Sequence, residues 1–361
     1  MTRRRYTFAC GPTLLPPEVL RQVQQDVLDW RGTGFSILEM SQWDPRLIEM
    51  FEAAEHDLRE LLSVPEHYRV FFLHGGASNQ FAMVPMNLLR GRRTADYVHT
   101  GLWSRKAIRE ARRYAEVGVA ATAEPFEFSR VPRQDELRLD PSAAYAHYTV
   151  CDSAQGLEFP YIPNTGDVPL VADCSSSLFT HELPVDRHGL LYASAQKNAA
   201  ATSLTIVIAR DDLLGHADQR TPTTFDYGVH ARTDSRFTTP PVFAWYLAGL
   251  MFAWVRAQGG VAAVAAAARL RADLLYRVLD GSGFYDSRVE PESRSPTVVP
   301  FFLADTRLEE TFVKEAEEAG LEALRGHMSV GGLRAGLYAG MPTAGVEALT
   351  AFMTDFETRH G

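Results

Sequence analysis

The sequence predicts an α/β fold in which helices cover a mostly parallel sheet, with a smaller α+β domain at the C-terminal end. A strand-like run over residues 68–73 ends in Gly75-Gly76 and leads into a helical pattern over residues 79–89, the order that starts a βαβ unit. Several later strand-like runs are apolar on both faces, as strands covered by helices on two sides should be. After Pro240-Pro241, two long helical patterns precede an alternating strand–helix tail.

The remaining elements follow from the different periodicities of helices and strands. Helices are expected after Pro16-Pro17 and over residues 46–62, 79–89, 103–115, 242–258, 261–279, 309–318 and 345–359. Strands are expected over residues 68–73, 97–99, 144–150, 168–172, 190–193, 204–209, 298–303 and 330–338. These elements indicate a large domain, residues 16–260, and a small domain, residues 261–361 together with the N-terminal segment 1–15.

The composition is typical of a globular protein with a substantial core. Of the 361 residues, 46% are hydrophobic and 22% are charged. The net charge of −9 argues against a nucleic-acid surface. No apolar run reaches the roughly 18 residues of a membrane span and no signal peptide is recognisable, so we expect a cytoplasmic protein without membrane contact. Cys10, Cys151 and Cys174 lack the spacing of a metal site, so we expect reduced thiols and no bound metal.

Two predicted strands end in residues that suit a ligand. Small residues follow the first strand, in Leu73-His-Gly-Gly-Ala-Ser-Asn-Gln80, where a helix begins. Backbone N–H groups at such a helix start can cradle a phosphate, although a tight turn explains the same residues. Asp173 ends a buried strand, at the edge where open α/β sheets bind ligands. It is either a helix N-cap or the partner of a cation such as a pyridinium nitrogen.

Lys197 follows another apolar strand and stands among small residues, in GLLYASAQKN. Desolvation would lower its pKa and favour a Schiff base with an aldehyde, and a surface lysine is the alternative. The order of glycine turn, aspartate and, 24 residues later, lysine favours a cofactor site. Trp103 is able to stack on a flat ring or to pack in the core. Arg334 is able to hold an α-carboxylate or to form a surface ion pair.

Together these stretches resemble the phosphoserine aminotransferases, which are fold-type I pyridoxal 5′-phosphate (PLP) enzymes. The resemblance runs from about Phe8 to the C-terminus. It is carried by GPTLLPPEVL, HGGASNQFAMVPMNLL, TADYVHTGLW, VADCSSS, GLLYASAQKN, RFTTPPVFAWYLAGLMFAWVRAQGG and SVGGLRAGLYAGMP. It implies a fold-type I transferase fold, a PLP-dependent aminotransferase activity on a small amino acid or 2-oxo acid, and a homodimer with shared active sites.

The resemblance also implies roles for the residues that hold the cofactor ring. Lys197 would bind the cofactor as a Schiff base, and Asp173 would hold the pyridinium nitrogen. Trp103 would stack on the ring, and Ser153 would lie near the cofactor hydroxyl. Gln196 would contact the cofactor phosphate.

Further implied roles concern the phosphate cradle and the substrate. Ala77 and Ser78 would form the cradle. Thr238 and Thr239 would reach the cofactor phosphate from the neighbouring subunit, which is why a homodimer is implied. Arg334 would hold the α-carboxylate of the substrate.

The departures from the family lie in the substrate pocket. Gln42 and Trp43 stand where the family has His-Arg, Met328 follows His327 where the family has arginine, and Cys10 replaces a serine. In the family these His and Arg side chains grip the substrate phosphate. Each lost charge-assisted hydrogen bond costs roughly 1.5–3 kcal/mol, so two losses would weaken phosphoserine binding by roughly two to four decades.

We therefore expect an aminotransferase of this family that acts on a non-phosphorylated amino acid or 2-oxo acid in specialised metabolism. One alternative is a genuine phosphoserine transaminase of serine biosynthesis, favoured by the near-complete resemblance elsewhere. A second is a PLP enzyme of the same fold that catalyses a non-transamination reaction, which the changes at Cys10 and Trp43 permit. A non-enzymatic binding protein is disfavoured, because Lys197, Asp173 and Arg334 are all retained.

Overall fold

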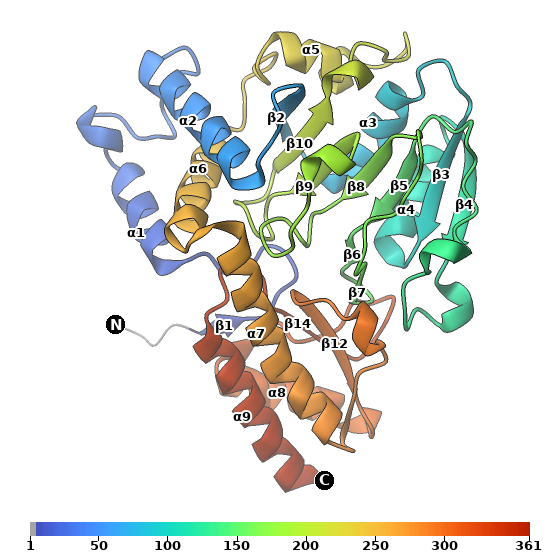
Figure 1. Ribbon diagram of the computed structural model, residues 1–361. Coiled ribbons are helices and arrows are strands. Elements are labelled where there is room, and N and C mark those ends of the chain that lie inside the picture. The colour runs from blue at the N-terminus through green and yellow to red at the C-terminus, as the bar shows by residue number, and fades with distance from the viewer. Residues whose placement is uncertain (1–4) are drawn as a thin grey trace.

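The computed structural model of the protein describes residues 5–361 and is organised around a mixed seven-stranded sheet (Figure 1). The strand order is β2-β10-β9-β8-β5-β3-β4. The strands are β2 (Tyr68–His74), β3 (Thr94–His99), β4 (Glu116–Thr122), β5 (Ala146–Thr149), β8 (Leu170–Asp173), β9 (Leu190–Ser194) and β10 (Leu204–Arg210). Within this sheet β10 is antiparallel to both neighbours and the other pairs are parallel. The predicted α/β fold with a mostly parallel sheet is therefore confirmed.

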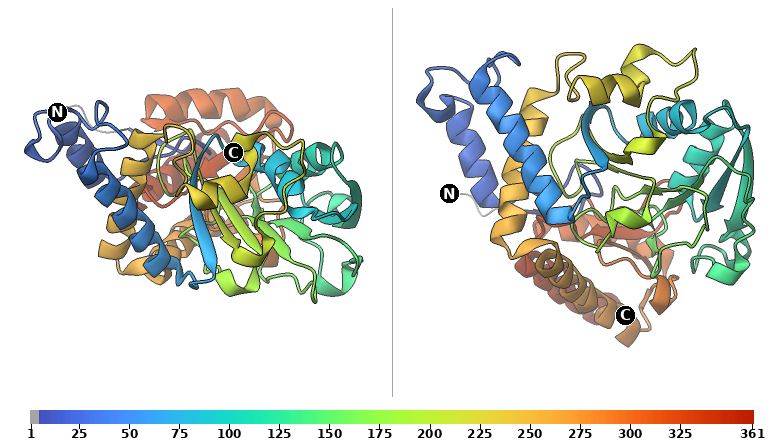
Figure 2. Two further views of the ribbon diagram at one scale, coloured as in Figure 1. Left: turned by 90° about the horizontal axis from the view of Figure 1, so that it is seen from above. Right: turned by 45° about the horizontal axis from the view of Figure 1, so that its top comes forward.

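Helices cover both faces of the sheet, as Figures 1 and 2 show. The helices of the described residues, including those of the C-terminal part, are α1 (Pro17–Asp26), α2 (Pro45–Leu62), α3 (Ala77–Leu88), α4 (Leu102–Ala111), α5 (Tyr227–Arg232), α6 (Val242–Ala257), α7 (Gly260–Gly281), α8 (Glu309–Glu318) and α9 (Thr343–His360). Phe71 and Val207 join a core cluster with residues of α3 and α4. Phe72 and Ile206, the next residues along the same strands, join a cluster with α2 and α6. This alternation explains why the strands are apolar on both faces.

The C-terminal part has a core of its own, in which Phe8 packs with Phe301, Phe312 and Phe356. Its sheet consists of β11 (Tyr285–Asp286), β12 (Val298–Leu303) and β14 (Leu333–Gly336), all paired antiparallel. β1 (Tyr6–Thr7) pairs in parallel with β13 (Leu321–Glu322), which ties the N-terminal strand to this part. The division into residues 16–260 and 261–361 with segment 1–15 stays a prediction, supported by the separate cores. Residues 1–4 of that segment lie outside the described residues.

Several elements differ from those predicted. β4 was not predicted, because most of its residues are exposed or half-buried at the sheet edge and lack the pattern of a covered strand. α4 ends one turn earlier than predicted. The strand expected over residues 330–338 is confined to β14, because Gly331 and Gly332 adopt φ angles of +80° and +63° in the left-handed region.

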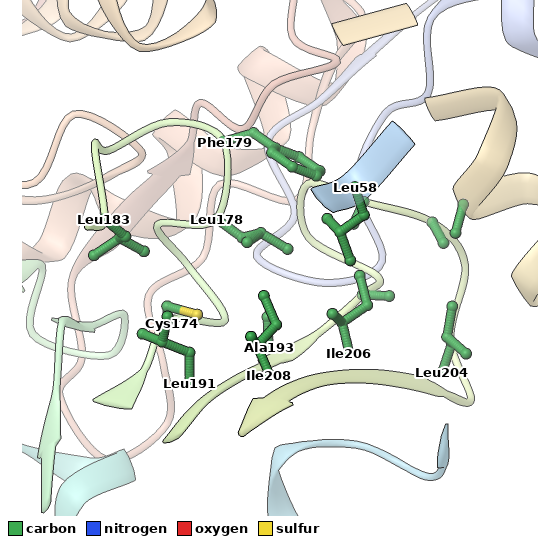
Figure 3. Packing of buried hydrophobic residues seen from close by; sticks show 14 of the residues in the cluster. Leu58, Cys174, Leu178, Phe179, Leu183, Leu191, Ala193, Leu204, Ile206 and Ile208 are labelled. Atoms are coloured by element: carbon green, nitrogen blue, oxygen red, sulfur yellow. The ribbon is translucent and has the colours of Figure 1, made fainter. Parts of the chain in front are cut away.

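An apolar layer packs against the strands that carry the candidate site. Figure 3 shows Cys174, which follows β8, among Leu178, Leu183 and Leu191. Burial raises the pKa of the Cys174 thiol, so this side chain acts as a small apolar residue. All three cysteines of the sequence are unpaired.

No single helix within residues 5–361 has the length and apolar composition of a membrane span. The consecutive helices α6 and α7 meet that test only as a pair, and they are bent by 82° relative to each other. The same part of the chain holds no group of three or more His, Cys, Asp or Glu side chains arranged to bind a metal ion.

Two buried histidines give the fold a pH-dependent stability. Burial lowers the pKa of His147 to about 3 and that of His188 to about 4, against about 6.5 in an unfolded chain. Between about pH 6.5 and 4, each imidazole therefore binds a proton only in the unfolded state. Stability should fall as the pH falls through this window, by up to about 1.4 kcal/mol per pH unit for each histidine.

This prediction is checked by measuring the melting temperature of the wild type and of His147→Phe at pH 7, 6 and 5. The pH dependence should be shallower in His147→Phe, whatever its stability at pH 7. His56→Asn, on the exposed side of α2, serves as the control and should keep the wild-type slope. Equal slopes in all three proteins would contradict the role of His147.

Candidate active site

Lys197 follows β9, at the edge where the parallel strands β3, β5, β8 and β9 all end. The residue is only 9% exposed. Its Nζ donates hydrogen bonds to Ser176 Oγ at 2.8 Å and to Ser153 Oγ at 3.0 Å. Burial lowers the pKa of this amine, and Asp173 partly opposes the shift. A neutral amine is the form that attacks a carbonyl carbon, so these surroundings favour the predicted Schiff-base chemistry.

Asp173, the last residue of β8, is buried and interacts electrostatically with Lys197. Its Oδ1 accepts the backbone N–H of Ser175 at 3.0 Å, a bond within a turn, and no helix begins here, so Asp173 is not the helix N-cap considered from the sequence. Burial raises the pKa of the Asp173 carboxyl, which the bonds from Ser175 and the charge of Lys197 oppose. A carboxylate in such a place is stabilised in its charged form by a cation, and a protonated ring nitrogen is one that fits.

Trp103 stands in the first turn of α4, and its ring centroid lies 5.6 Å from Lys197 Nζ. Asp152 fixes this turn, because its Oδ2 accepts the backbone N–H groups of Trp103 at 3.0 Å and Ser104 at 3.1 Å. The indole Nε1 is buried without a hydrogen-bond partner among the described residues. The ring thus presents a rigidly placed aromatic face on the side of the lysine.

The predicted phosphate cradle lies at the start of α3. Gly76 is the N-cap of this helix and supplies no side-chain cap, and Ala77 and Ser78 are its first two residues. A Cβ on Gly76 would lie only 3.0 Å from Ser194 Oγ, so glycine keeps the approach open. Ser194 Oγ also donates to Gln196 Oε1 at 2.6 Å, which brings the cradle and Gln196 together. Helix N–H groups beside an amide side chain suit an anion.

Arg334 of β14 reaches the same site from the C-terminal part. Its Nη1 donates to the backbone oxygen of Ser153 at 2.9 Å, while its Nε is buried without a partner in residues 5–361. Burial, followed by the charges of Arg334 and Lys106, lowers the pKa of His327. Cys10 is close to Arg334 and Lys197, although burial raises the pKa of its thiol. These residues form the side of the site where a substrate carboxylate would lie.

Five predicted residues are not brought into this cluster by a single chain. Gln42 and Trp43 lie on the segment between α1 and α2, at the outer edge of the molecule in Figure 1, and Trp43 is 68% exposed. Thr238 and Thr239 are exposed on the segment between α5 and α6. The backbone oxygen of Thr239 shares a hydrogen bond with His74 Nε2 at 2.7 Å, near the cradle. Met328 is 99% exposed.

Three residues of the site were missed from the sequence. Asp152 orients Trp103, and Ser176 contacts Lys197. Lys106 places its Nζ 4.4 Å from the centroid of the Trp103 ring. Asp152 stands next to Ser153 and Ser176 lies three residues after Asp173, so their closeness to predicted residues was the available signal. Lys106 lies three residues after Trp103 in a predicted helix, a spacing that brings two side chains together on one face.

The whole chain, and not only the site, matches one family of enzymes. The sequence profile of aminotransferase class-V matches residues 5–349. The chain belongs to the class-V aminotransferases. It is 48% identical, over 361 residues and the full length of both chains, to a phosphoserine aminotransferase of Pseudomonas putida. A phosphoserine aminotransferase structure from Bacillus circulans subsp. alkalophilus gives a TM-score of 0.97 at 40% identity and covers 99% of both chains.

A PLP-bound phosphoserine aminotransferase structure from Trichomonas vaginalis gives a TM-score of 0.92 at 33% identity, covering 97% of this chain and 100% of that chain. These similarities confirm the predicted phosphoserine aminotransferase family, its fold type I and the predicted class of enzyme, a PLP-dependent aminotransferase.

The predicted function on a non-phosphorylated substrate is wrong, because curated relatives that are 46% to 50% identical over at least 99% of both chains are phosphoserine aminotransferases. The prediction weighed the arginines missing at Trp43 and Met328 and did not consider Lys106. Lys106 and His327 interact electrostatically beside Arg334, so positive charge on the substrate side is not limited to the two positions that changed. The alternative named from the sequence, a phosphoserine transaminase, is the better supported one.

Proposed function

We propose that the protein is a phosphoserine aminotransferase of serine biosynthesis, which uses PLP to transfer the amino group between phosphoserine and a 2-oxo acid. One observation carries the proposal. Lys197, Asp173 and Arg334 meet at one sheet edge, in a chain similar over its full length to enzymes of that name. We also propose a cytoplasmic location, which the unpaired and half-buried thiol of Cys10 supports, since a reducing compartment preserves free thiols.

The residues present fit PLP. The N–H groups after Gly76, with Gln196 beside them, suit the cofactor phosphate, and the Asp173 carboxylate suits the ring nitrogen. The face of Trp103 suits the ring itself. When bound, PLP supplies an electron sink for cleavage of the substrate Cα–H bond.

The chain's own residues would then orient the substrate and move one proton. Arg334 would bind the α-carboxylate through its unpaired Nε, while its Nη1 stays anchored on Ser153. This contact would turn the Cα–H bond toward Lys197, whose amine would take the proton from Cα and return it. The hydroxyl groups of Ser153 and Ser176 would hold that amine in place.

The phosphate of the substrate needs cations at the outer side of the site. Lys106 on α4 is the cation proposed for this role, and His327, on the loop before β14, is a hydrogen-bonding group beside it, because burial and the charges of Arg334 and Lys106 lower its pKa. Lys106 Nζ lies 4.4 Å from the centroid of the Trp103 ring, so its charge would lie near a cofactor stacked on that ring. An ammonium group binds phosphate as a point charge.

Lys106→Met is expected to raise the KM for phosphoserine by about 3- to 10-fold, the effect of losing an ion pair of about 1 kcal/mol at an exposed site. The KM for glutamate, which has no phosphate, should change less than twofold. Arg109→Met removes a charge from the next turn of α4 and is the matched control. Steady-state kinetics of the three proteins with both amino donors test this. An equal rise for both donors would refute a phosphate contact.

The function itself is tested with the PLP-loaded enzyme, phosphoserine and 2-oxoglutarate, by measuring the glutamate formed. Serine and alanine at the same concentration serve as comparison donors. We expect kcat/KM for phosphoserine to exceed that for serine by at least about 100-fold, because unpaired cations in a site disfavour a donor without phosphate. Equal values for phosphoserine and serine would overturn the proposal.

We also propose a homodimer, supported by exposed apolar side chains on the N-terminal segment. Leu28, Phe35, Leu38 and Trp43 are 80%, 56%, 61% and 68% exposed. Trp43→Ser is expected to weaken the dimer by about 30-fold, as for an interface tryptophan worth about 2 kcal/mol. Sedimentation equilibrium over a dilution series measures this, with Leu270→Ser on α7, also well exposed, as the control. A wild type that sediments as a monomer would contradict the proposal.

A further inference from the structure

A series of buried hydrogen bonds connects the C-terminal part of the fold with the amine of Lys197. It starts at Glu158, the last residue of β7 (Leu157–Glu158), which is buried. The Glu158 carboxylate accepts Ser295 Oγ at 2.9 Å through Oε2, and its Oε1 shares a hydrogen bond with His181 Nδ1 at 3.1 Å. Ser295 Oγ, held in this way, accepts the backbone N–H of Thr297 at 3.1 Å. The carboxylate therefore fixes the backbone turn that carries Thr297.

Thr297 extends this series of hydrogen bonds into the active site. Its hydroxyl donates to the backbone oxygen of Ser176 at 3.2 Å, and Asn198 Nδ2 donates to the same oxygen at 3.0 Å. The hydroxyl of Ser176 in turn accepts Lys197 Nζ at 2.8 Å. Ser176, Ser295 and Thr297 are all buried, so water does not compete for these hydrogen bonds, and the bonds hold the three residues rigidly.

We infer that Thr297 is a positioning residue for transamination, which holds Ser176 where its hydroxyl can keep the free amine of Lys197 in line with the substrate Cα. The inference rests on the proposed function, in which Lys197 moves the Cα proton. That amine must be free of the cofactor while it moves the proton, and a lysine on its flexible four-carbon stem then needs another anchor. A displacement of 1 Å can cost about 100-fold in rate, so a modest shift of Ser176 should be measurable.

The experiment compares Thr297→Val with Thr297→Ser in the PLP-loaded enzyme. In Thr297→Val, kcat for phosphoserine should fall by about 2- to 10-fold, the range for one neutral hydrogen bond, with an unchanged KM. The kinetic isotope effect on kcat with phosphoserine deuterated at Cα should increase, because proton transfer becomes slower. Thr297→Ser keeps the hydroxyl and should restore both values. Ser176→Ala, which removes the hydroxyl itself, should show the same signature at least as strongly.

Thr165→Val is the matched control, because the Thr165 hydroxyl also donates to a backbone oxygen, that of Val168 at 2.7 Å. This bond lies just before the start of β8, whereas Ser176 follows its end. Hydrogen exchange of the peptide around Ser176 should increase in Thr297→Val and not in Thr165→Val. An isotope effect in Thr297→Val equal to the wild-type value would overturn the inference. A wild type that does not transaminate phosphoserine would instead overturn the proposed function, before any variant is compared.

Discussion

Lys197→Ala is expected to lower kcat for phosphoserine by about 100- to 10,000-fold, which is the contribution of a positioned proton-transfer group. Of the two other lysines, Lys106 is exposed on α4, with its Nζ 4.4 Å from the centroid of the Trp103 ring, and Lys314 is exposed on α8, so neither has the buried position of Lys197. The buried amine is also the group whose lowered pKa suits covalent attachment of the cofactor. The rate of glutamate formation from phosphoserine and 2-oxoglutarate measures the loss.

The sequence provides its own control for this prediction, because it contains three lysines, Lys106, Lys197 and Lys314. Borohydride treatment of the PLP-loaded enzyme followed by peptide mapping should place the cofactor on Lys197. Lys314→Ala, on the exposed side of α8, should keep the wild-type rate. Attachment of the cofactor to Lys106 or Lys314, or a Lys197→Ala enzyme with wild-type activity, would falsify the assignment.

The covered strands of the sheet were predictable because each of them carries two apolar faces. Phe71 and Phe72 illustrate this, since neighbouring residues of β2 enter different core clusters on opposite faces of the sheet. β4 leaves all but one of its residues exposed or half-buried, so its sequence lacks that signal. The pairing of β1 with β13 joins residues more than 300 positions apart, and no local pattern in the sequence indicates such a contact.

The site was predictable where its residues end strands, and less so where they act through others. Asp173 and Lys197 could be selected because a charged residue at the end of a buried apolar strand needs a partner that offsets the cost of burying its charge. Asp152 lies three residues after the end of β5, but its side chain binds the backbone of α4, and the sequence does not reveal such a partner. Thr297 and Ser176 are ordinary polar residues in the sequence, and their importance lies in contacts between distant segments.

The substrate was predicted wrongly for a physical reason. If the phosphate were bound only from fixed positions of the family, the changes at Trp43 and Met328 would remove its binding site. Electrostatic attraction depends on the distance of a charge from the phosphate and not on the position that supplies it. Lys106, on α4, and His327, on the loop before β14, come from segments about 220 residues apart, and the fold is needed to see that they interact.

Arg334→Leu is expected to lower kcat/KM by about 10- to 150-fold for phosphoserine and for glutamate alike. The guanidinium would form charge-assisted hydrogen bonds to the α-carboxylate that both donors share, worth roughly 1.5–3 kcal/mol. This common loss separates Arg334 from Lys106, whose replacement should affect phosphoserine alone. Steady-state kinetics with each donor measure the two ratios.

Arg325→Leu is the matched control for Arg334→Leu, because Arg325 lies in the same C-terminal part and pairs on the surface with Glu310 at 2.6 Å. It should leave kcat/KM for both donors within twofold of the wild type. Arg334→Lys keeps the charge but not the planar fork, so it should recover part of the loss for both donors. Arg334→Leu could instead lower kcat/KM for phosphoserine tenfold or more and leave kcat/KM for glutamate unchanged. In that case the arginine would have to bind the phosphate, and the α-carboxylate would need another partner in the site.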